Sequence, residues 1–269
     1  MSLLARGRLL LGILGSSVNA LRERDSWTSV VIHDSRFAKI PGALAVPILC
    51  GHAKDQLRCP ENLTIVLMHN YRDEPLAERA LKYTGIDNYI VLEPQFEGEW
   101  RDSIKLTTIA DFLESGKCST EYLLYMDSRD ACLRADPAEG IRLLEETGIE
   151  CLFSAETQFY GYECIPDTKQ WANQNARQHE APELYINAGV FLGRTEFIRE
   201  LLRASMQYIH SEELTRSAFQ KHLFGGTLCN TLPDYPNGVG SDQQIIRFLH
   251  PTFYPRMQCD YDGKLAVLR

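Results

Sequence analysis

Two acidic residues follow an apolar segment near the middle of the chain. The run Tyr122–Met126 has the character of a buried strand, and Asp127 and Asp130 come directly after it. In an open α/β sheet, ligands bind beyond the carboxyl ends of the strands. Carboxylates at such a place could hold a hard divalent cation, which bridges the phosphates of a nucleotide and stabilises a departing diphosphate. The pair therefore indicates chemistry on a phosphate-bearing substrate.

The motif by itself leaves a second interpretation open. Oxygen ligands favour magnesium or manganese, and although Cys132 is near, no histidine or cysteine close to the pair has the spacing of a zinc site. Aspartate is also a favoured residue at helix N-termini, so Asp127 and Asp130 could simply cap a following helix. An Asp-x-x-Asp motif is too short to choose between the two.

Length and charge limit the classes of function. With 269 residues, of which 44% are hydrophobic and 24% charged, the chain suits one large α/β domain or a domain with an extension. The net charge of -8 and the lack of a long Lys/Arg run argue against nucleic acid as the main partner. An acidic protein that binds a phosphorylated ligand must offset its charge locally, with a metal ion or a few basic side chains.

The cysteines indicate neither a zinc site nor a disulfide framework. None of them forms a Cys-x-x-Cys pair, and reduced, structural thiols are favoured, with disulfides left open if the chain is exported. The eight positions are 50, 59, 118, 132, 151, 164, 229 and 259. Cys151 lies in an apolar run, where a buried thiol is expected.

The first residues allow two interpretations. Arg6 and Arg8 precede the short apolar stretch Leu9–Gly15 and a group of small residues, which is the order of a secretory signal. The alternative is an amphipathic helix, Leu3–Arg24, that packs on the main domain or contacts a membrane surface as a peripheral element. The helix is favoured, which predicts a cytoplasmic protein; the secretory pathway is the alternative if residues 1–20 act as a signal.

The pattern of apolar runs predicts an extension followed by a regular domain. Residues 1–60 are expected to hold the N-terminal helix and short strands near 29–32 and 43–50, and residues 61–269 the main domain. Strands alternate with helices there, which predicts a mostly parallel sheet flanked by helices. Expected strands are 63–68, 88–92, 122–126, 150–154 and 185–193; expected helices are 74–83, 103–114, 138–147, 196–209 and one beginning at 241. Residues 157–183 are interpreted as a polar loop.

A glycine interrupts the expected strand Tyr185–Gly193, whose sequence is Y-I-N-A-G-V-F-L-G. Glycine inside a strand often marks a close approach of the backbone to a ligand. A bulge or tight packing between strands would require it equally well, and both interpretations stay open.

Five motifs in order resemble one protein family. They are E-G-E-W-R-D-S-I-K (97–105), Y-M-D-S-R-D (125–130), L-F-S-A-E (152–156), Y-I-N-A-G-V-F-L-G (185–193) and S-D-Q-Q (241–244). Together they are similar to the glycosyltransferase domain of collagen lysyl hydroxylases and related procollagen-type glycosyltransferases. The similarity spans residues 62–262 and implies a GT-A type, Rossmann-like α/β fold.

The resemblance assigns the donor site. Asp127 and Asp130 match the family's acids that bind Mn2+ (or Mg2+) and, through it, the diphosphate of a UDP-sugar. Trp100 matches a family tryptophan at the nucleotide, and Lys105 a lysine that could contact phosphate or sugar, although an exposed helix lysine would explain its position as well. Arg129 departs from the family's aromatic residue, which stacks on the base; a guanidinium could stack there or pair with phosphate.

Further matches concern the sugar. Asn187, Ala188 and Gly189 match an Asn-Ser-Gly segment that approaches the sugar. Asp242 matches an acid near the donor sugar and acceptor, and helix capping by Ser241 or Asp242 is an alternative or additional explanation. Glu156 matches a family acid that could orient the sugar or receive a structural arginine.

One feature of the family has no match. Its members supply a late histidine as a third metal ligand, and His250 lies too early in this chain to correspond to it. The expectation is that water and substrate complete the metal's coordination, or that the matching segment lies beyond the sequence.

The combined prediction is a metal-dependent glycosyltransferase that moves a sugar from a nucleotide-sugar, UDP-linked, to an acceptor hydroxyl with retention. If the enzyme inverts, Asp242 or Glu156 would be the base to test. The alternatives are a degenerate binding or scaffold module and a nucleotidyltransferase, whose glycine-rich loop is absent after the first strand; a haloacid-dehalogenase-type phosphatase is disfavoured because position 129 is arginine. The acceptor could be a glycan, a peptide or a lipid-linked molecule.

Overall fold

A computed structural model describes residues 57–98, 100–133, 136–157, 166–181, 185–210, 241–265 and 267–268. The helix expected over Leu3–Arg24, the strands expected near 29–32 and 43–50, and the segment 211–240 lie outside the described residues. The boundary expected at residue 60 therefore stays a prediction.

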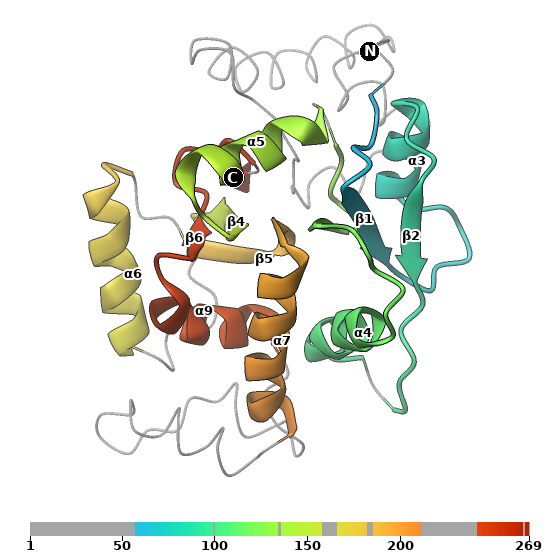
Figure 1. Cartoon of the computed structure of the whole chain (residues 1–269). Coiled ribbons are helices and arrows are strands. Elements are labelled where there is room, and N and C mark those ends of the chain that lie inside the picture. Colours follow the sequence, from blue (N-terminus) through green and yellow to red (C-terminus); the bar gives the residue numbers. More distant parts are fainter. Residues whose placement is uncertain are drawn as a thin grey trace, which may run out of the picture.

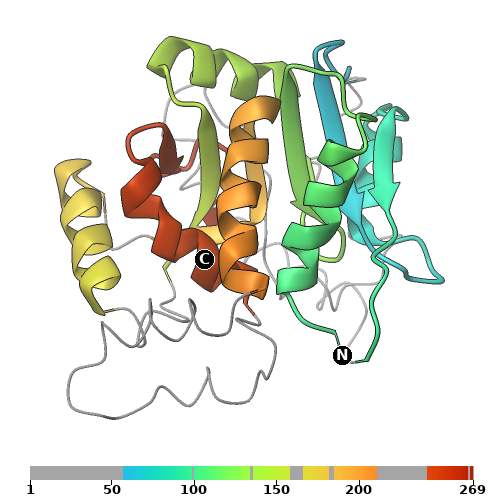
Figure 2. The ribbon, with the colours of Figure 1, turned by 60° about the horizontal axis from the view of Figure 1, so that its bottom comes forward.

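Helices flank a twisted sheet (Figures 1 and 2). Its strands are β1 (Leu63–Met68), β2 (Tyr89–Leu92), β3 (Tyr122–Asp127), β4 (Cys151–Glu156), β5 (Tyr185–Arg194), β6 (Met257–Cys259) and β7 (Val267–Leu268). The helices are α3 (Leu76–Tyr83), α4 (Ser103–Glu114), α5 (Pro137–Thr147), α6 (Pro166–Gln178), α7 (Thr195–His210) and α9 (Asp242–Phe253). Among the described residues, no helix has both the length and the apolar character needed to cross a bilayer.

The sheet is mixed. Its strands lie in the order β2-β1-β3-β5-β4-β6, and β7 pairs with β4. β1 is parallel to β2 and β3, and β4 is parallel to β6 and β7, but β5 is antiparallel to both β3 and β4. The predicted α/β class with flanking helices is confirmed. The sheet, predicted to be mostly parallel, is mixed because β5 runs antiparallel to both of its neighbours. The alternation does not fix direction because the long connection before β5 allows either.

Each face of the sheet has its own core. Along β1, Val66 and Met68 face one core, whereas Ile65 and Leu67 face the other. Helices α4, α7 and α9 contribute to the first core, and α3 and α5 to the second. Because both faces are covered, the strands read as continuous apolar runs, which is why most of them could be predicted.

The two glycines of β5 have different surroundings, and Gly193 permits tight packing between strands. A Cβ on Gly193 would lie 2.8 Å from the Glu150 carbonyl oxygen and 2.9 Å from the Cys151 Cβ. Between Phe153 and Ser154 the pairing of β4 shifts from Phe191 to Asn187, so Gly189 lies in a bulge. The bulge interpretation is confirmed for Gly189, and tight packing between strands applies to Gly193. A close approach of the backbone to a ligand at Gly189 stays a prediction.

One helix contradicts the sequence prediction. The polar segment 157–183 was expected to be a loop, but Pro166–Gln178 forms α6. Its buried residues, Thr168, Ala172, Asn175 and Ala176, have helical spacing but small or polar side chains. A periodic pattern of large apolar residues is therefore missing from this helix.

The described cysteines are reduced. Cys59, Cys118, Cys132, Cys151 and Cys259 are free, as the sequence predicts for these five. Burial raises the pKa of the Cys151 thiol well above its usual value, which suits an inert structural side chain.

His250 belongs to the interior of this fold. It lies on α9, is 1% exposed, and contacts Trp171 of α6 edge to face at 4.7 Å between ring centroids. Burial lowers its pKa to about 3, although a hydrogen bond with the Met257 backbone opposes the shift. Its place in the core agrees with the expectation that His250 is not the family's late metal ligand.

Folding stability should fall with acidity because of His250. The histidine is neutral in the folded state and titrates near pH 6.5 when unfolded, so the unfolded state gains protons first as the pH falls below 6.5 toward 3. The free energy of unfolding of the wild type should therefore fall with decreasing pH over pH 4–6, by up to about 1.4 kcal/mol per pH unit from His250 alone, and His250→Phe should remove this contribution. Urea unfolding at a series of pH values measures this. The control His179→Phe, at an exposed position, should keep the wild-type slope; equal slopes in all three proteins would contradict the assignment.

Candidate functional site

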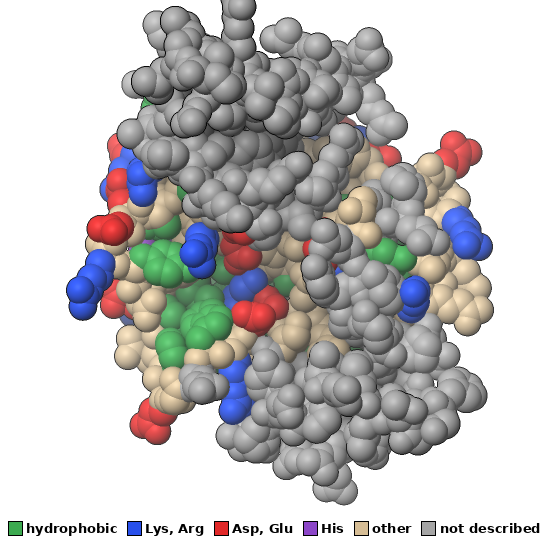
Figure 3. Space-filling view, turned by 180° about the vertical axis from the view of Figure 1, so that it is seen from behind, with side chains coloured by type: hydrophobic (Ala, Val, Ile, Leu, Met, Phe, Trp, Pro, Cys, Tyr) green, Lys and Arg blue, Asp and Glu red, His purple; other side chains and the backbone are tan. Residues whose placement is uncertain are grey.

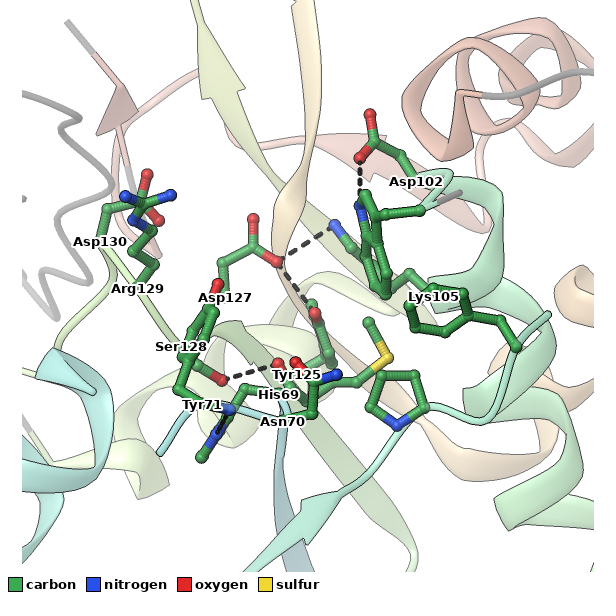
Figure 4. A pocket seen from close by; sticks show the side chains of 14 residues that line it. His69, Asn70, Tyr71, Asp102, Lys105, Tyr125, Asp127, Ser128, Arg129 and Asp130 are labelled. Atoms are coloured by element: carbon green, nitrogen blue, oxygen red, sulfur yellow. Dashed lines mark hydrogen bonds and ion pairs between the residues drawn. The ribbon is translucent and has the colours of Figure 1, made fainter. Parts of the chain in front are cut away.

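The carboxyl end of β3 is fixed by contacts with two neighbouring elements. Ser128 donates its hydroxyl to the Met68 carbonyl at the end of β1, at 3.0 Å. The Ala77 amide at the start of α3 donates to the Ser128 carbonyl, also at 3.0 Å. Asp127, the last residue of β3, thus projects beyond the sheet from a braced turn (Figure 4).

Lys105 brings two of the predicted acids together. Its ammonium lies 3.1 Å from Oδ1 of Asp127 and 2.7 Å from Oδ2 of Asp242. It also donates to the Ala188 carbonyl at 3.3 Å. The Tyr125 hydroxyl donates to the same Oδ1 of Asp127 at 2.9 Å, and Figure 4 shows this contact beside the Lys105 ion pair. We refer to Lys105, Asp127 and Asp242 as the ion triad.

The ammonium of the triad stays charged despite its burial. Lys105 is 8% exposed, and burial alone would lower its pKa, but Asp127 and Asp242 raise the pKa well above the ordinary lysine value. Burial raises the pKa of Tyr125 well above its usual range, so its hydroxyl is a neutral donor. The alternative interpretation of Lys105 as an exposed helix lysine is wrong, because the start of α4 faces the interior. Its contact with phosphate or sugar stays a prediction.

The N-terminus of α9 supplies the second acid. Ser241 is the N-cap and accepts a hydrogen bond from the Gln244 amide at 3.3 Å, while Asp242 Oδ1 accepts from the Gln243 amide at 2.6 Å. Of the two capping candidates, Ser241 is therefore the N-cap, and Asp242 is the first residue of the helix and contacts Lys105. The Gln243 side chain accepts from the Ala188 amide at 3.2 Å and donates to Glu156.

The bulge of β5 is tied into the same network. Asn187 Oδ1 accepts from the Gly189 amide at 2.7 Å, and its Nδ2 donates to Glu156 at 3.2 Å. Both polar backbone atoms of Ala188 are used, one by Gln243 and the other by Lys105. The Ala188 carbonyl therefore connects the bulge to the ion triad, while the Asn187 side chain holds the Gly189 amide and contacts Glu156.

The ionic partner of Glu156 is a buried arginine. It forms an ion pair with Arg247 of α9, and the two residues are 3% and 0% exposed. Arg247 also donates to the Ile186 carbonyl at 2.8 Å. Burial raises the pKa of Glu156, and Arg247 opposes the shift. Of the two interpretations of Glu156, the structure bears out the one with an arginine partner.

Arg247 was missed by sequence reasoning. A signal was present, because the residue stands inside the apolar run I-I-R-F-L of a predicted helix. A charge in such a run is rarely buried without a partner. Its partner could not be named, since Glu156 lies far away in the sequence.

A cavity of about 440 Å³ opens beside the ion triad. Three carboxylates, Asp102, Asp127 and Asp130, and two basic side chains, Lys105 and Arg129, line it. Its other lining residues are Met68, His69, Asn70, Tyr71, Pro94, Phe96, Trp100, Tyr125 and Ser128. The space-filling view shows hydrophobic side chains gathered beside acidic and basic ones on one face of the molecule (Figure 3).

Two pairs of aromatic rings line the cavity, Phe96 with Trp100 and His69 with Tyr71. Trp100 is 46% exposed, contacts Phe96 edge to face, and donates its indole N–H to Asp102 at 3.1 Å. Tyr71 is 50% exposed and stacks on His69 at 5.4 Å between ring centroids. The predicted residue Trp100 is thus joined by Tyr71 and Phe96, which the sequence motifs did not single out.

The second acid of the Asp-x-x-Asp motif lies apart from the first. Asp130 and Arg129 both line the cavity, but in Figure 4 they lie together at one side, away from the Asp127 carboxylate. Within the described residues, no group of three or more histidine, cysteine or acidic side chains is arranged to hold a metal ion. The oxygen donors of Asp127 and Asp130 suit Mg2+ or Mn2+ in kind, provided that water and substrate supply further ligands.

No protein-family model matches the sequence, and no curated protein is significantly similar to it.

Removing Arg247 should be costly to folding. Arg247→Met leaves the buried Glu156 carboxylate without its ionic partner, and we expect a loss of about 3–5 kcal/mol in the free energy of unfolding. The double variant Arg247→Met with Glu156→Gln should recover part of this loss. Urea unfolding measures all three proteins.

A surface pair provides the control. Arg203→Met breaks the exposed pair with Glu114 and should change stability by less than about 1 kcal/mol. A small effect of Arg247→Met, similar to that of Arg203→Met, would show that the buried pair does not support the site.

Proposed function

We propose that this chain is a metal-dependent glycosyltransferase that transfers a sugar from a UDP-sugar to an acceptor hydroxyl. The observation that carries the proposal is the cavity at the carboxyl end of β3, where acids, a buried lysine and exposed aromatic rings surround one space. Its α/β fold, with a mixed sheet flanked by helices, is compatible with the GT-A type that the motifs imply.

The exposed aromatic rings of the cavity suit the nucleoside. Four large hydrophobic side chains are exposed in the described part of the chain, and three of them, Tyr71, Phe96 and Trp100, line this cavity. Exposed rings stack on planar bases with little dependence on base identity. Arg129, at another part of the lining, can pair with phosphate or stack through its planar guanidinium.

The acidic lining supports the need for a cation. Three carboxylates outnumber the two basic side chains, so a diphosphate would meet net repulsion in the cavity. Asp127 and Asp130 are the residues that would hold Mn2+ or Mg2+. When bound, the metal would stabilise charge on the departing diphosphate.

The sugar is assigned to the region next to Lys105 where β5 and α9 lie, although no residue of these two elements is among those that line the cavity. Lys105, fixed by Asp127 and Asp242, presents a positive charge between the diphosphate and sugar positions. Asn187 donates a hydrogen bond to the Glu156 carboxylate, which also forms an ion pair with Arg247 and accepts from the Gln243 side chain. These contacts favour positioning over proton transfer for Glu156, which agrees with a retaining reaction that needs no strong base on the acceptor.

The test is UDP release from a panel of UDP-sugars, with and without Mn2+. We expect one sugar to be turned over only with metal, and Asp127→Asn to reduce the rate roughly 100-fold or more, because charge stabilisation at the leaving group is lost. Asp262→Asn, at an exposed ion pair, should behave as wild type. Mn2+-dependent UDP binding without turnover of any sugar would indicate a binding module; absence of both would overturn the donor site.

The role of the exposed aromatic rings can be tested through binding alone. We expect Tyr71→Ala or Trp100→Ala to weaken UDP binding by a factor of about 5–100, as removal of one stacking partner does elsewhere. Tyr83→Ala removes an exposed tyrosine outside the cavity and is the matched control. Isothermal titration calorimetry in the presence of Mn2+ measures the affinities. Equal affinities in all variants would place the base elsewhere.

A further inference from the structure

Lys105 is a cation built into the predicted metal site. Its ammonium is within 3.1 Å of Asp127, one of the two predicted metal ligands, and within 2.7 Å of Asp242. Its side chain is 10% exposed, and its stem continues into the buried first turn of α4 next to Leu106. Solvent therefore screens this charge little.

We propose that Lys105 keeps the affinity of Asp127 for a divalent metal low until a diphosphate enters, so that metal and nucleotide bind together rather than separately. The inference rests on the proposed function, since it concerns the same donor site. It adds a residue that couples the two ligands.

The coupling follows from the charges around Asp127. Oδ1 of this carboxylate already accepts from both Lys105 and Tyr125. A dication on the same carboxylate would lie close to the ammonium and be repelled by it. A diphosphate is negatively charged and attracts both the metal ion and the Lys105 ammonium. When it binds between them, its charge offsets their mutual repulsion.

The contacts around the ion triad hold the Lys105 side chain in place. Asp242 is 5% exposed and fixed at the N-terminus of α9 by its own hydrogen bond to Gln243, and the Ala188 carbonyl that accepts from Lys105 belongs to the β5 bulge. Moving the ammonium away would leave Asp242 buried without its ionic partner. We therefore expect the Lys105 ammonium to stay beside Asp127 when a metal ion binds.

The decisive measurement is the Mn2+ affinity of the full chain, by electron paramagnetic resonance of free Mn2+, without and with UDP. For the wild type we expect weak Mn2+ binding alone and a gain of at least about 10-fold with UDP, within the usual range of coupling between two ligands. Lys105→Met should bind Mn2+ alone about 10-fold more tightly and show a smaller gain with UDP. Tight Mn2+ binding by the wild type without UDP would overturn the proposal, as would unchanged or weaker binding by Lys105→Met.

Control variants distinguish the effect of the Lys105 charge on Mn2+ affinity from an effect of the substitution on folding. Lys105→Arg retains the positive charge and should keep the weak affinity of the wild type for Mn2+ alone. Lys105→Gln removes the charge but keeps a donor for Asp127 and Asp242, and takes the place of Lys105→Met if circular dichroism shows that variant to be unfolded. Lys117→Met, at an exposed position beyond α4, should have no effect. Tight Mn2+ binding by Lys105→Arg, equal to that of Lys105→Gln, would also overturn the proposal.

The two proposals fail in different ways. If the wild type never binds UDP, with or without Mn2+, the donor site is wrong. If UDP binds with Mn2+ but Lys105→Met leaves Mn2+ affinity unchanged, the donor site stands and the coupling by Lys105 is wrong.

Discussion

A buried ammonium between two carboxylates requires several elements of the chain to converge. Lys105 comes from the start of α4, Asp127 from the end of β3, and Asp242 from the start of α9. The charges of Lys105 and Asp242 would be costly to bury alone, and their pairing offsets much of that cost. The ion triad therefore depends on the positions of α4 and α9 against the same end of the sheet.

A second buried ion pair secures the placement of α9. Arg247 lies further along this helix and binds Glu156 at the end of β4, next to the bulge of β5. Gln243 joins the two groups, because its side chain contacts both Glu156 and the Ala188 backbone. Polar contacts thus extend from the interior of the sheet to the lining of the cavity, and the Ala188 carbonyl of the β5 bulge connects them to Lys105.

The sequence was informative where local patterns decide the structure. β1 and α4 have the predicted bounds because continuous or periodic runs of large apolar residues mark them. α6 was missed because its buried face is small and polar, and the direction of β5 because alternation of elements says nothing about a strand reached through a long connection. The residues of the site were found largely through motif similarity, which placed Asp127, Lys105 and Asp242 in one region. Their contacts could not be predicted: which acid faces Lys105, and which base faces Glu156, depend on long-range packing.

The central claim is that the end of β3 holds a metal-bound nucleotide diphosphate. Crystals of the protein grown with Mn2+ and UDP, with diffraction recorded on both sides of the manganese absorption edge, would locate the metal directly. The account predicts one anomalous peak beside Asp127, in contact with the diphosphate, with Lys105 near the same phosphates and the base against Tyr71 or Trp100. Manganese bound elsewhere, or UDP bound away from this cavity, would contradict it.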